Sequence, residues 1–252
     1  MDEHVDTTRE IEAVSMEEGA GAQVRRLFPT AHRRHLDPFV LLDEFTVVPP
    51  AAFPEHPHGG FEAVTYMLEG AFRHRDDLGN DETVSSGGAQ RFTAGRRIVH
   101  AELPGGEGTS HGLQLWVNLP RDLKQLEPDY QAVPAEDIPE SEIDGVIVRT
   151  VVGDGSPVQL HTRVRYTDVE LRPQSDTATL QYEGQIPLEW NGLIYVLEGR
   201  IELPGKALAR GRAILFEGGG RLQITAQDTA RFVVIAGVPH GEPIHQRGSF
   251  VL

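Results

Sequence analysis

The chain has 252 residues, of which 39% are hydrophobic and 24% charged, and its formal net charge is −15 at pH 7. This acidic balance disfavours direct binding to DNA or to anionic lipid, because cationic side chains supply most of the affinity for phosphate groups. The absence of cysteine excludes disulfides and thiolate metal ligands, and the absence of a long apolar run or a signal-like start predicts a cytoplasmic protein that does not enter membranes.

Short apolar segments rich in β-branched and aromatic residues follow one another along the chain, separated by Gly, Pro, Asn or Asp. Such segments with such boundaries predict β-strands. The predicted strands cover residues 40–48, 63–70, 112–119, 145–153, 193–199, 213–218 and 231–237, and residues 76–81 predict a hairpin turn. Regular short strands joined by turns are typical of all-β barrels and sandwiches.

Two segments differ from this strand pattern. Residues 121–131 predict a short helix that Pro128 would end. The acidic, proline-containing stretch 133–145 is the best candidate for a linker. We therefore divide the chain into an N-terminal domain, residues 1–133, and a C-terminal domain, residues 134–252.

A short sequence recurs on the two sides of this linker. Tyr-Met-Leu-Glu-Gly ends at Gly70, and Tyr-Val-Leu-Glu-Gly ends at Gly199. The two copies lie 129 residues apart, which is about half the chain. A repeat at this distance indicates a duplicated β-barrel.

Two pairs of polar residues have the spacing of metal ligands on strands. His56 and His58 are two residues apart, and His100 and Glu102 repeat this spacing about 40 residues later. Residues i and i+2 of a strand project from the same face, so the four side chains would converge if the two strands are neighbours. Pro57 cannot donate a ladder hydrogen bond, which places the first pair at a strand start or edge. Three imidazoles and one carboxylate suit Fe(II), Mn, Co, Ni, Cu or Zn better than Ca or Mg.

Other side chains have both a functional and a structural interpretation. Glu62, His74 and His111 could support the metal ligands, because a metal-bound histidine usually donates its second ring nitrogen to an acceptor. A surface glutamate explains Glu62 equally simply. For His74, an ordinary hairpin arm is favoured over the wall of a pocket. Four aromatic residues could line a cavity for a planar aromatic substrate or form ordinary barrel core. They are Phe53, Phe61, Phe92 and Trp116.

Several longer segments resemble those of a known family. The runs HPHGGFEAVTYMLEGAFRHRDDLGN, FTAGRRIVHAE and LQLWVNLP, with DPFVLLDEF near the start and GVPHGEPIHQRGSFVL at the end, are similar to pirin sequences. Pirins are bicupins within the cupin superfamily. The resemblance covers nearly the whole chain and implies an all-β fold of two tandem cupin barrels of the jelly-roll type.

The resemblance also implies a function for the four candidate ligands. In pirins, the residues matching His56, His58, His100 and Glu102 hold one iron ion in the N-terminal barrel, so we expect one divalent transition metal, with Fe(II) favoured. Some members have quercetin 2,3-dioxygenase activity, which requires a small aromatic substrate and O2, and Glu102 would then be catalytic by accepting the substrate's hydroxyl proton. Other members are regulatory partners, and the alternative is a non-enzymatic protein whose metal redox state controls binding to a transcription factor or metabolic enzyme.

Two positions beside the candidate site depart from the pirin pattern. Gly59 stands where pirins often carry Arg, and Arg97 stands where they often carry Gly. We expect these differences to alter the shape or charge of the site entrance.

The 129-residue offset maps the four ligand positions onto the second half of the chain. The residues at the mapped positions are Gln185, Pro187, Thr229 and Arg231. None of them is a usual metal ligand. The C-terminal barrel is therefore expected to be metal-free.

Overall fold

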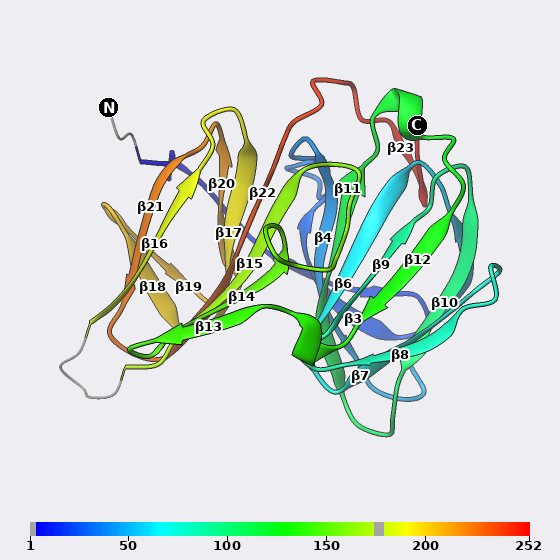
Figure 1. Ribbon diagram of the computed structural model, residues 1–252, viewed down its shortest axis with the longest axis horizontal. Helices are drawn as coiled ribbons and strands as arrows, with labels where there is room; N and C mark the ends of the chain where they lie inside the picture. Colours follow the sequence, from blue (N-terminus) through cyan, green and yellow to red (C-terminus); the bar gives the residue numbers. More distant parts are fainter. Residues whose placement is uncertain (1–3, 174–178) are drawn as a thin grey trace. The chain divides into compact units, whose positions relative to one another are not determined.

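The computed structural model describes residues 4–173 and 179–252, and their regular structure is almost entirely β-strand (Figure 1). The all-β prediction is confirmed. Each of the seven predicted strands corresponds to an observed strand, with ends that agree within two residues. Among the described residues, no helix has the length and apolar character needed to cross a bilayer.

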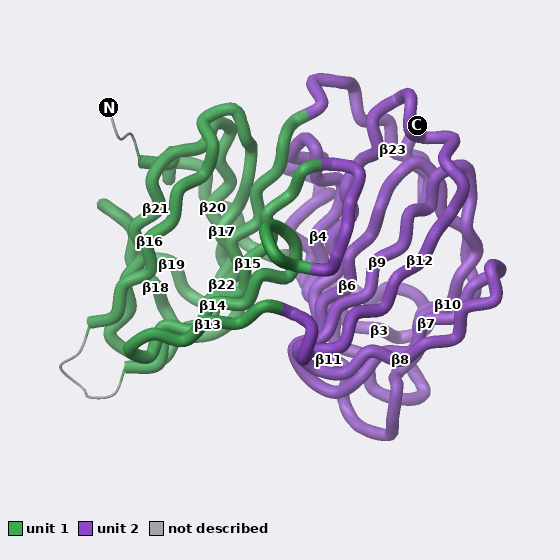
Figure 2. Tube along the Cα trace, viewed as in Figure 1, with its two compact units in different colours: residues 1–13, 139–156, 163–239 green, residues 14–138, 157–162, 240–252 purple. Residues whose placement is uncertain are grey.

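The chain divides into two compact units, which Figure 2 colours separately. Unit 1 comprises residues 1–13, 139–156 and 163–239, and unit 2 comprises residues 14–138, 157–162 and 240–252. This differs from a single division at residues 133/134. The first residues of the chain belong to the unit built mainly from its second half, and the last residues belong to the unit built mainly from its first half. The start of the chain pairs with a strand of unit 1, and the end of the chain pairs with Gly59 of unit 2.

Unit 2 contains a seven-stranded and a four-stranded antiparallel sheet. The strands of the larger sheet, in spatial order, are β12 (Asp129–Val133), β9 (Ala89–Thr93), β6 (Phe61–Glu69), β11 (Ser110–Asn118), β4 (Phe39–Val47), β3 (Ala22–Phe28) and β2 (Val14–Glu18). Those of the smaller sheet are β5 (Phe53–His58), β10 (Ile98–Pro104), β7 (Ala71–Asp76) and β8 (Asp81–Ser85). A short hairpin of β23 (Gln246–Arg247) and β24 (Phe250–Val251) follows near the end of the chain.

Unit 1 repeats the arrangement of a seven-stranded and a four-stranded sheet. The larger sheet has the order β1 (Arg9–Glu12), β20 (Arg212–Glu217), β17 (Asn191–Glu198), β22 (Ala230–Gly237), β15 (Val164–Leu171), β14 (Val146–Val152) and β13 (Glu140–Ile143). The smaller sheet has the order β16 (Leu180–Ile186), β21 (Gly220–Ala226), β18 (Arg200–Leu203) and β19 (Lys206–Ala209).

The repeated pentapeptide marks equivalent places in the two units. Strand β6 lies third in its seven-stranded sheet and β17 lies third in the other. Each strand is followed by a glycine with positive φ, 70° at Gly70 and 71° at Gly199, and the chain then enters the four-stranded sheet. Glycine suits this turn because a side chain is strained in the left-handed region. The duplication inferred from the sequence is thus supported strand by strand.

The predicted helix over residues 121–131 is wrong. Only a 3₁₀ turn, Arg121–Leu123, forms there, and Asp129–Val133 is instead strand β12 paired with β9. Tertiary pairing with β9 overrides a weak local helix preference. The expected linker 133–145 also contains structure, namely a 3₁₀ turn, Ala135–Asp137, and the edge strand β13.

The interiors of the two units differ in a way that positions the functional site. Along β6, Phe61 and Ala63 belong to one apolar cluster and Met67 to another, whereas Thr65 on the same face is polar and buried. Among the described residues of unit 1, an apolar cluster includes residues from both of its sheets. A polar layer therefore interrupts the core of unit 2 at the level of Thr65.

The end of the chain is hydrogen-bonded to the turn between β5 and β6. Val251 donates its backbone N–H to Gly59, and the Lys124 ammonium donates to the carbonyl oxygens of Gly60 and Val251 over 2.9 and 3.2 Å. Gly60 has φ +83°, and a Cβ atom on it would lie 1.8 Å from the Val251 carbonyl oxygen. Glycine is required here both by conformation and by close approach.

Replacing Gly60 by alanine is therefore expected to lower the free energy of unfolding more than replacing a glycine that has a positive φ but open space around its Cβ position. Gly79→Ala is the matched control, because Gly79 has φ +96° and no heavy atom within 4 Å of its Cβ position. We expect Gly79→Ala to lower the free energy of unfolding by about 1–2 kcal/mol and Gly60→Ala by about 2 kcal/mol more. Urea denaturation measures both, and equal losses would contradict the close packing of residues 250–251 on Gly60.

Candidate metal centre

The two strands that carry the candidate ligands are neighbours, as the sequence analysis required. Strand β5 is the edge of the four-stranded sheet and pairs antiparallel with β10. In this register His100 lies opposite His56, and Ile98 lies opposite His58. The expectation that Pro57 marks an edge strand is confirmed, since β5 has a partner on one side only.

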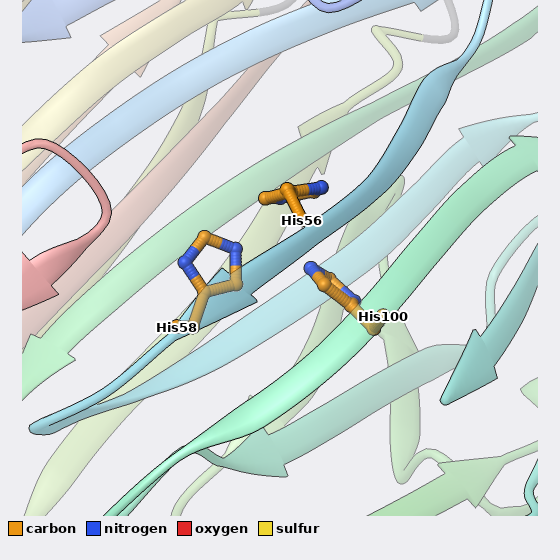
Figure 3. Close-up of side chains that lie close together, drawn as sticks. All are labelled: His56, His58 and His100. Carbon is orange, nitrogen blue, oxygen red and sulfur yellow. The ribbon is translucent and has the colours of Figure 1, made fainter. Parts of the chain in front are cut away.

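Three imidazole rings meet over this strand pair, as Figure 3 shows. The ring centroids are 4.5 Å apart for His56 and His58, 4.6 Å for His56 and His100, and 4.8 Å for His58 and His100. One ligand nitrogen from each ring lies within 4.8 Å of the other two. The three rings thus surround one point.

The hydrogen bonds of His56 and His58 identify their free nitrogens. The Nδ1 of His56 lies 2.7 Å from the Pro54 carbonyl oxygen, and the Nδ1 of His58 lies 3.2 Å from that of Ser249. A carbonyl oxygen only accepts, so each neutral ring carries its proton on Nδ1. The Nε2 lone pair of each ring remains available for a metal ion.

His100 presents the same nitrogen. Its Nδ1 lies 3.3 Å from Nδ1 of His74, and its Nε2 is buried without a hydrogen-bond partner. A buried polar atom without a partner usually lowers the stability of the fold by about 1–3 kcal/mol, so its presence indicates that a ligand binds there. The unpaired Nε2 of His100 and the two free Nε2 atoms beside it fit a transition-metal ion.

Burial keeps the imidazoles of His58 and His100 in the neutral form that binds metals. Burial, followed by the neighbouring charge of His56, lowers the pKa of His58 to about 3. Burial, followed by the charges of His58, His56 and His74, lowers the pKa of His100 well below 6.5. Near neutral pH both rings can therefore offer lone pairs without first losing a proton.

Glu102 is close to this group but is placed differently. Its carboxylate lies within 4.8 Å of ligand atoms of His100 and His74 and is not part of the cluster formed by His56, His58 and His100. A register shift separates His100 from Glu102 in the pairing of β10 with β5. The structure therefore brings three of the four predicted ligands together and leaves the fourth beside them.

Two glutamine side chains hold the Glu102 carboxylate. Gln90 Nε2 donates to Oε1 over 2.9 Å, and Gln114 Nε2 donates to Oε2 over 2.8 Å. The amide oxygens in turn accept from Tyr130 O–H and Trp116 Nε1–H, over 3.1 and 3.2 Å. Burial and the charge of Glu102 raise the pKa of Tyr130, so its hydroxyl remains a donor. The two glutamine amides therefore hold the Glu102 carboxylate in place, and Tyr130 and Trp116 hold the amides.

A cavity of about 350 Å³ opens on His56 and His58. Its apolar wall includes Val24, Leu41, Phe45, Phe53 and Trp116, and its polar wall includes Glu18, Arg26, Asp43 and Gln114. This volume lies within the range of about 300–1,000 Å³ typical of small-molecule sites. Phe53 and Trp116 thus line a cavity, whereas Phe61 and Phe92 pack in the core against His58.

Comparison with known families gives the deciding observation. The family model described as Pirin matches residues 21–117, and the one described as Pirin C-terminal cupin domain matches residues 166–252. A pirin-like protein of Solanum lycopersicum is 42% identical over 253 residues, which cover 97% of this chain and 85% of that protein. The chain belongs to the pirin family. Its two units are pirin cupin domains, as the sequence resemblance implied.

Solved structures agree with this assignment. A quercetin 2,3-dioxygenase of Acinetobacter baumannii has a TM-score of 0.89 and 28% identity, over 99% of this chain and 92% of that chain. The bacterial pirin YhhW of Escherichia coli, in complex with nickel(II), has a TM-score of 0.73 and 21% identity, over 90% and 95% of the two chains. The second comparison shows the shared bicupin fold.

The other predicted residues have mixed outcomes in this pirin fold. Glu62 is buried, but it accepts from Thr93 and His161 and does not contact the imidazole cluster. His111 lies 3.0 Å from a carboxylate oxygen of Glu44. His74 occupies a hairpin arm and also contacts His100. Of these three described residues, His74 is the one that contacts a candidate ligand, His100.

The mapping of ligand positions onto the second pirin domain was partly wrong. Strands β5 and β10 correspond in sheet order to β16 and β21, so Gln185 on β16 lies in the matching strand. Thr229 directly precedes β22, and Arg231 is the second residue of that strand. In sheet order β22 corresponds to β11, whereas His100 and Glu102 lie on β10. The loops of the two units differ in length, and a constant offset fails beyond the first pair. Leu222 and Ile224 of β21 belong to an apolar core cluster, and the metal-free second barrel stays a prediction.

Proposed function

We propose that this pirin-family chain is a metal-dependent dioxygenase that acts on flavonol-like substrates with O2. The observation that carries the proposal is a cavity with aromatic walls that opens directly on two candidate metal ligands, His56 and His58. Similarity to a quercetin 2,3-dioxygenase supports the same reaction. His56, His58 and His100 would hold the metal, with Glu102 as a fourth ligand or as a base beside it.

The cavity walls suit a flat ring system with several hydroxyl groups. Phe45, Phe53 and Trp116 offer aromatic surface, on which a planar ring gains both burial and stacking energy. Opposite charges on Arg26 and Asp43 meet in two hydrogen bonds of 2.8 and 2.6 Å. The ion pair supplies both a donor and an acceptor for substrate hydroxyls.

Glu102 is the residue that we assign to proton transfer. When bound, a metal ion acts as a Lewis acid that makes a coordinated hydroxyl easier to deprotonate. The Glu102 carboxylate is buried beside His100 and can accept that proton. Gln90 and Gln114 hold it through their amide groups, which keeps its lone pairs directed without supplying a competing proton acceptor.

The test is a flavonol assay on protein of known metal content. Natively purified protein is analysed for metal, then mixed with quercetin without O2 and finally exposed to air. We expect flavonol absorbance and O2 to fall together only after exposure. His56→Ala should lose both the metal and the turnover, because His56 supplies one of the three clustered nitrogens.

Metal-loaded protein that leaves quercetin unchanged in air would overturn the dioxygenase proposal. The regulatory hypothesis would then be tested by pull-downs with the ferrous, ferric and metal-free forms. Identical partners for all three forms would reject a redox switch. The cavity beside His56 favours the enzyme, because a site closed to solvent would suffice for a switch.

A further inference from the structure

A buried chain of three side chains leads away from the metal ligand His100. The Nδ1 of His100 lies 3.3 Å from Nδ1 of His74, and the Nε2 of His74 lies 2.9 Å from Oδ2 of Asp76. The side chains of His74 and Asp76 are completely inaccessible to solvent. All three residues come from adjacent strands, since β10 pairs with β7 in a register that places His100 opposite Asp76 and Glu102 opposite His74.

The direction of each hydrogen bond in this chain follows from Asp76. Its carboxylate accepts from the backbone N–H groups of Leu78 and Asn80, over 3.0 Å each, and from the Asn80 side-chain amide. An ionised carboxylate only accepts, so the Nε2 of His74 must carry a proton and donate it to Asp76. A neutral His74 then has its lone pair on Nδ1, and the Nδ1 of His100 must donate to it. His100 is left with a bare Nε2, which is the buried atom without a partner.

We propose that Asp76 and His74 are positioning residues that set the tautomer and the ring orientation of His100 so that its Nε2 faces the metal. This inference rests on the proposed metal site and adds two residues to it. His56 and His58 are each fixed by a backbone carbonyl, whereas the interior position of His100 on β10 offers an imidazole acceptor instead. A backbone carbonyl oxygen accepts from Nδ1 of His56 and of His58 and so fixes their tautomers. The chain of Asp76 and His74 fixes the tautomer of His100 in the same way.

A second metal ion between His74, His100 and Glu102 is the competing explanation of the same cluster. Both nitrogens of His74 are already engaged, one with Asp76 and one with His100. The only buried nitrogen without a partner in this cluster is the Nε2 of His100, so the described residues favour one metal and a supporting chain.

Two substitutions at His74 separate this role from simple packing. His74 stacks on Tyr130 with ring centroids 4.2 Å apart, and His74→Phe would keep an aromatic ring there while removing the acceptor for His100. His74→Asn is the conservative partner, because its Oδ1 lies near the position of the imidazole Nδ1 and can still accept. Removing such a supporting group typically weakens metal binding about 10–100-fold.

The experiment uses the full chain without metal and then with Ni(II). Long-range ¹H–¹⁵N spectra of the metal-free protein report which ring nitrogen of His100 is protonated. We expect the proton on Nδ1 in the wild type and in His74→Asn, and a mixture of the two tautomers in His74→Phe. Titration with Ni(II) should then show a loss of about 10–100-fold for His74→Phe and less than about threefold for His74→Asn.

The outcomes distinguish this inference from the proposed function. A proton on Nε2 of His100 in the wild type would overturn the inference, even if no variant folds well enough to be titrated. An unchanged tautomer and unchanged Ni(II) affinity in His74→Phe would overturn it as well. A wild-type protein that binds no metal but shows the expected tautomer would instead contradict the proposed metal site and leave the supporting chain intact.

Discussion

His100→Ala is expected to weaken the binding of Ni(II) by several hundredfold. His100 is the most deeply buried of the three clustered histidines, and its Nε2 has no other partner in the described structure. Structural metal sites with four ligands are worth about 10–16 kcal/mol, so one ligand contributes about 3–4 kcal/mol, which corresponds to a few hundredfold in affinity. Isothermal titration of chelator-treated protein with Ni(II) measures the change directly.

The control for this prediction is a histidine outside the cluster. His32 is exposed, and the one hydrogen bond described for it uses its backbone N–H. His32→Ala should therefore bind Ni(II) like the wild type. Comparable affinities for His100→Ala and the wild type would show that the metal sits elsewhere. Urea denaturation of the metal-free variants checks the fold, and His100→Ala should lower the free energy of unfolding by about 2–5 kcal/mol, because it removes a buried ring and its hydrogen bond to His74.

Much of the fold was accessible from the sequence because its signals are local. Strands such as β4, β6 and β11 are apolar on most positions and are bounded by turn residues, so composition alone located them. The repeated pentapeptide located equivalent turns because both need a glycine with positive φ, at Gly70 and Gly199. Strand β12 was mistaken for a helix because its stability comes from pairing with β9, and no local pattern encodes that partner.

The candidate site divides in the same way. His56, His58 and His100 could be predicted because strand geometry converts a spacing of two into a shared face. Gln90 and Gln114 could not be predicted, because polar side chains in strands usually face solvent and the sequence does not show that these face Glu102.

The contact of Asp76 with His74 could not be predicted from the sequence for a different reason. Residues 76–81 were interpreted only as a hairpin turn, which they form. The same carboxylate accepts from two backbone N–H groups of that turn and from His74. The sequence does not distinguish an aspartate that only forms a turn from one that also binds a histidine near the metal site. The register of β7 with β10, which places Asp76 opposite His100, makes this distinction.

Acidification of the metal-free protein is expected to destabilise it well before its carboxylates titrate. The pKa of His58 is lowered to about 3 in the folded chain, chiefly by burial, from 6.5 in the unfolded chain. Between these values the unfolded chain binds a proton that the folded chain does not, so stability falls as the pH falls. From pH 7.5 to pH 5 this difference lowers the free energy of unfolding by about 2 kcal/mol for His58. His100 adds to the loss, because burial lowers its pKa in the same direction.

Urea denaturation at a series of pH values, in the presence of a chelator, measures this loss. Replacing His58 and His100 together by glutamine removes both protonation sites, and the free energy of unfolding of that variant should fall by at least about 2 kcal/mol less than that of the wild type over the same range. His35 and His240, whose pKa values are also lowered by burial, account for the dependence that is left. A wild-type stability that is constant between pH 7.5 and pH 5 would mean that these imidazoles are accessible to protons in the folded chain. Bound metal should steepen the dependence in the same direction, because protons and the metal compete for the same Nε2 lone pairs.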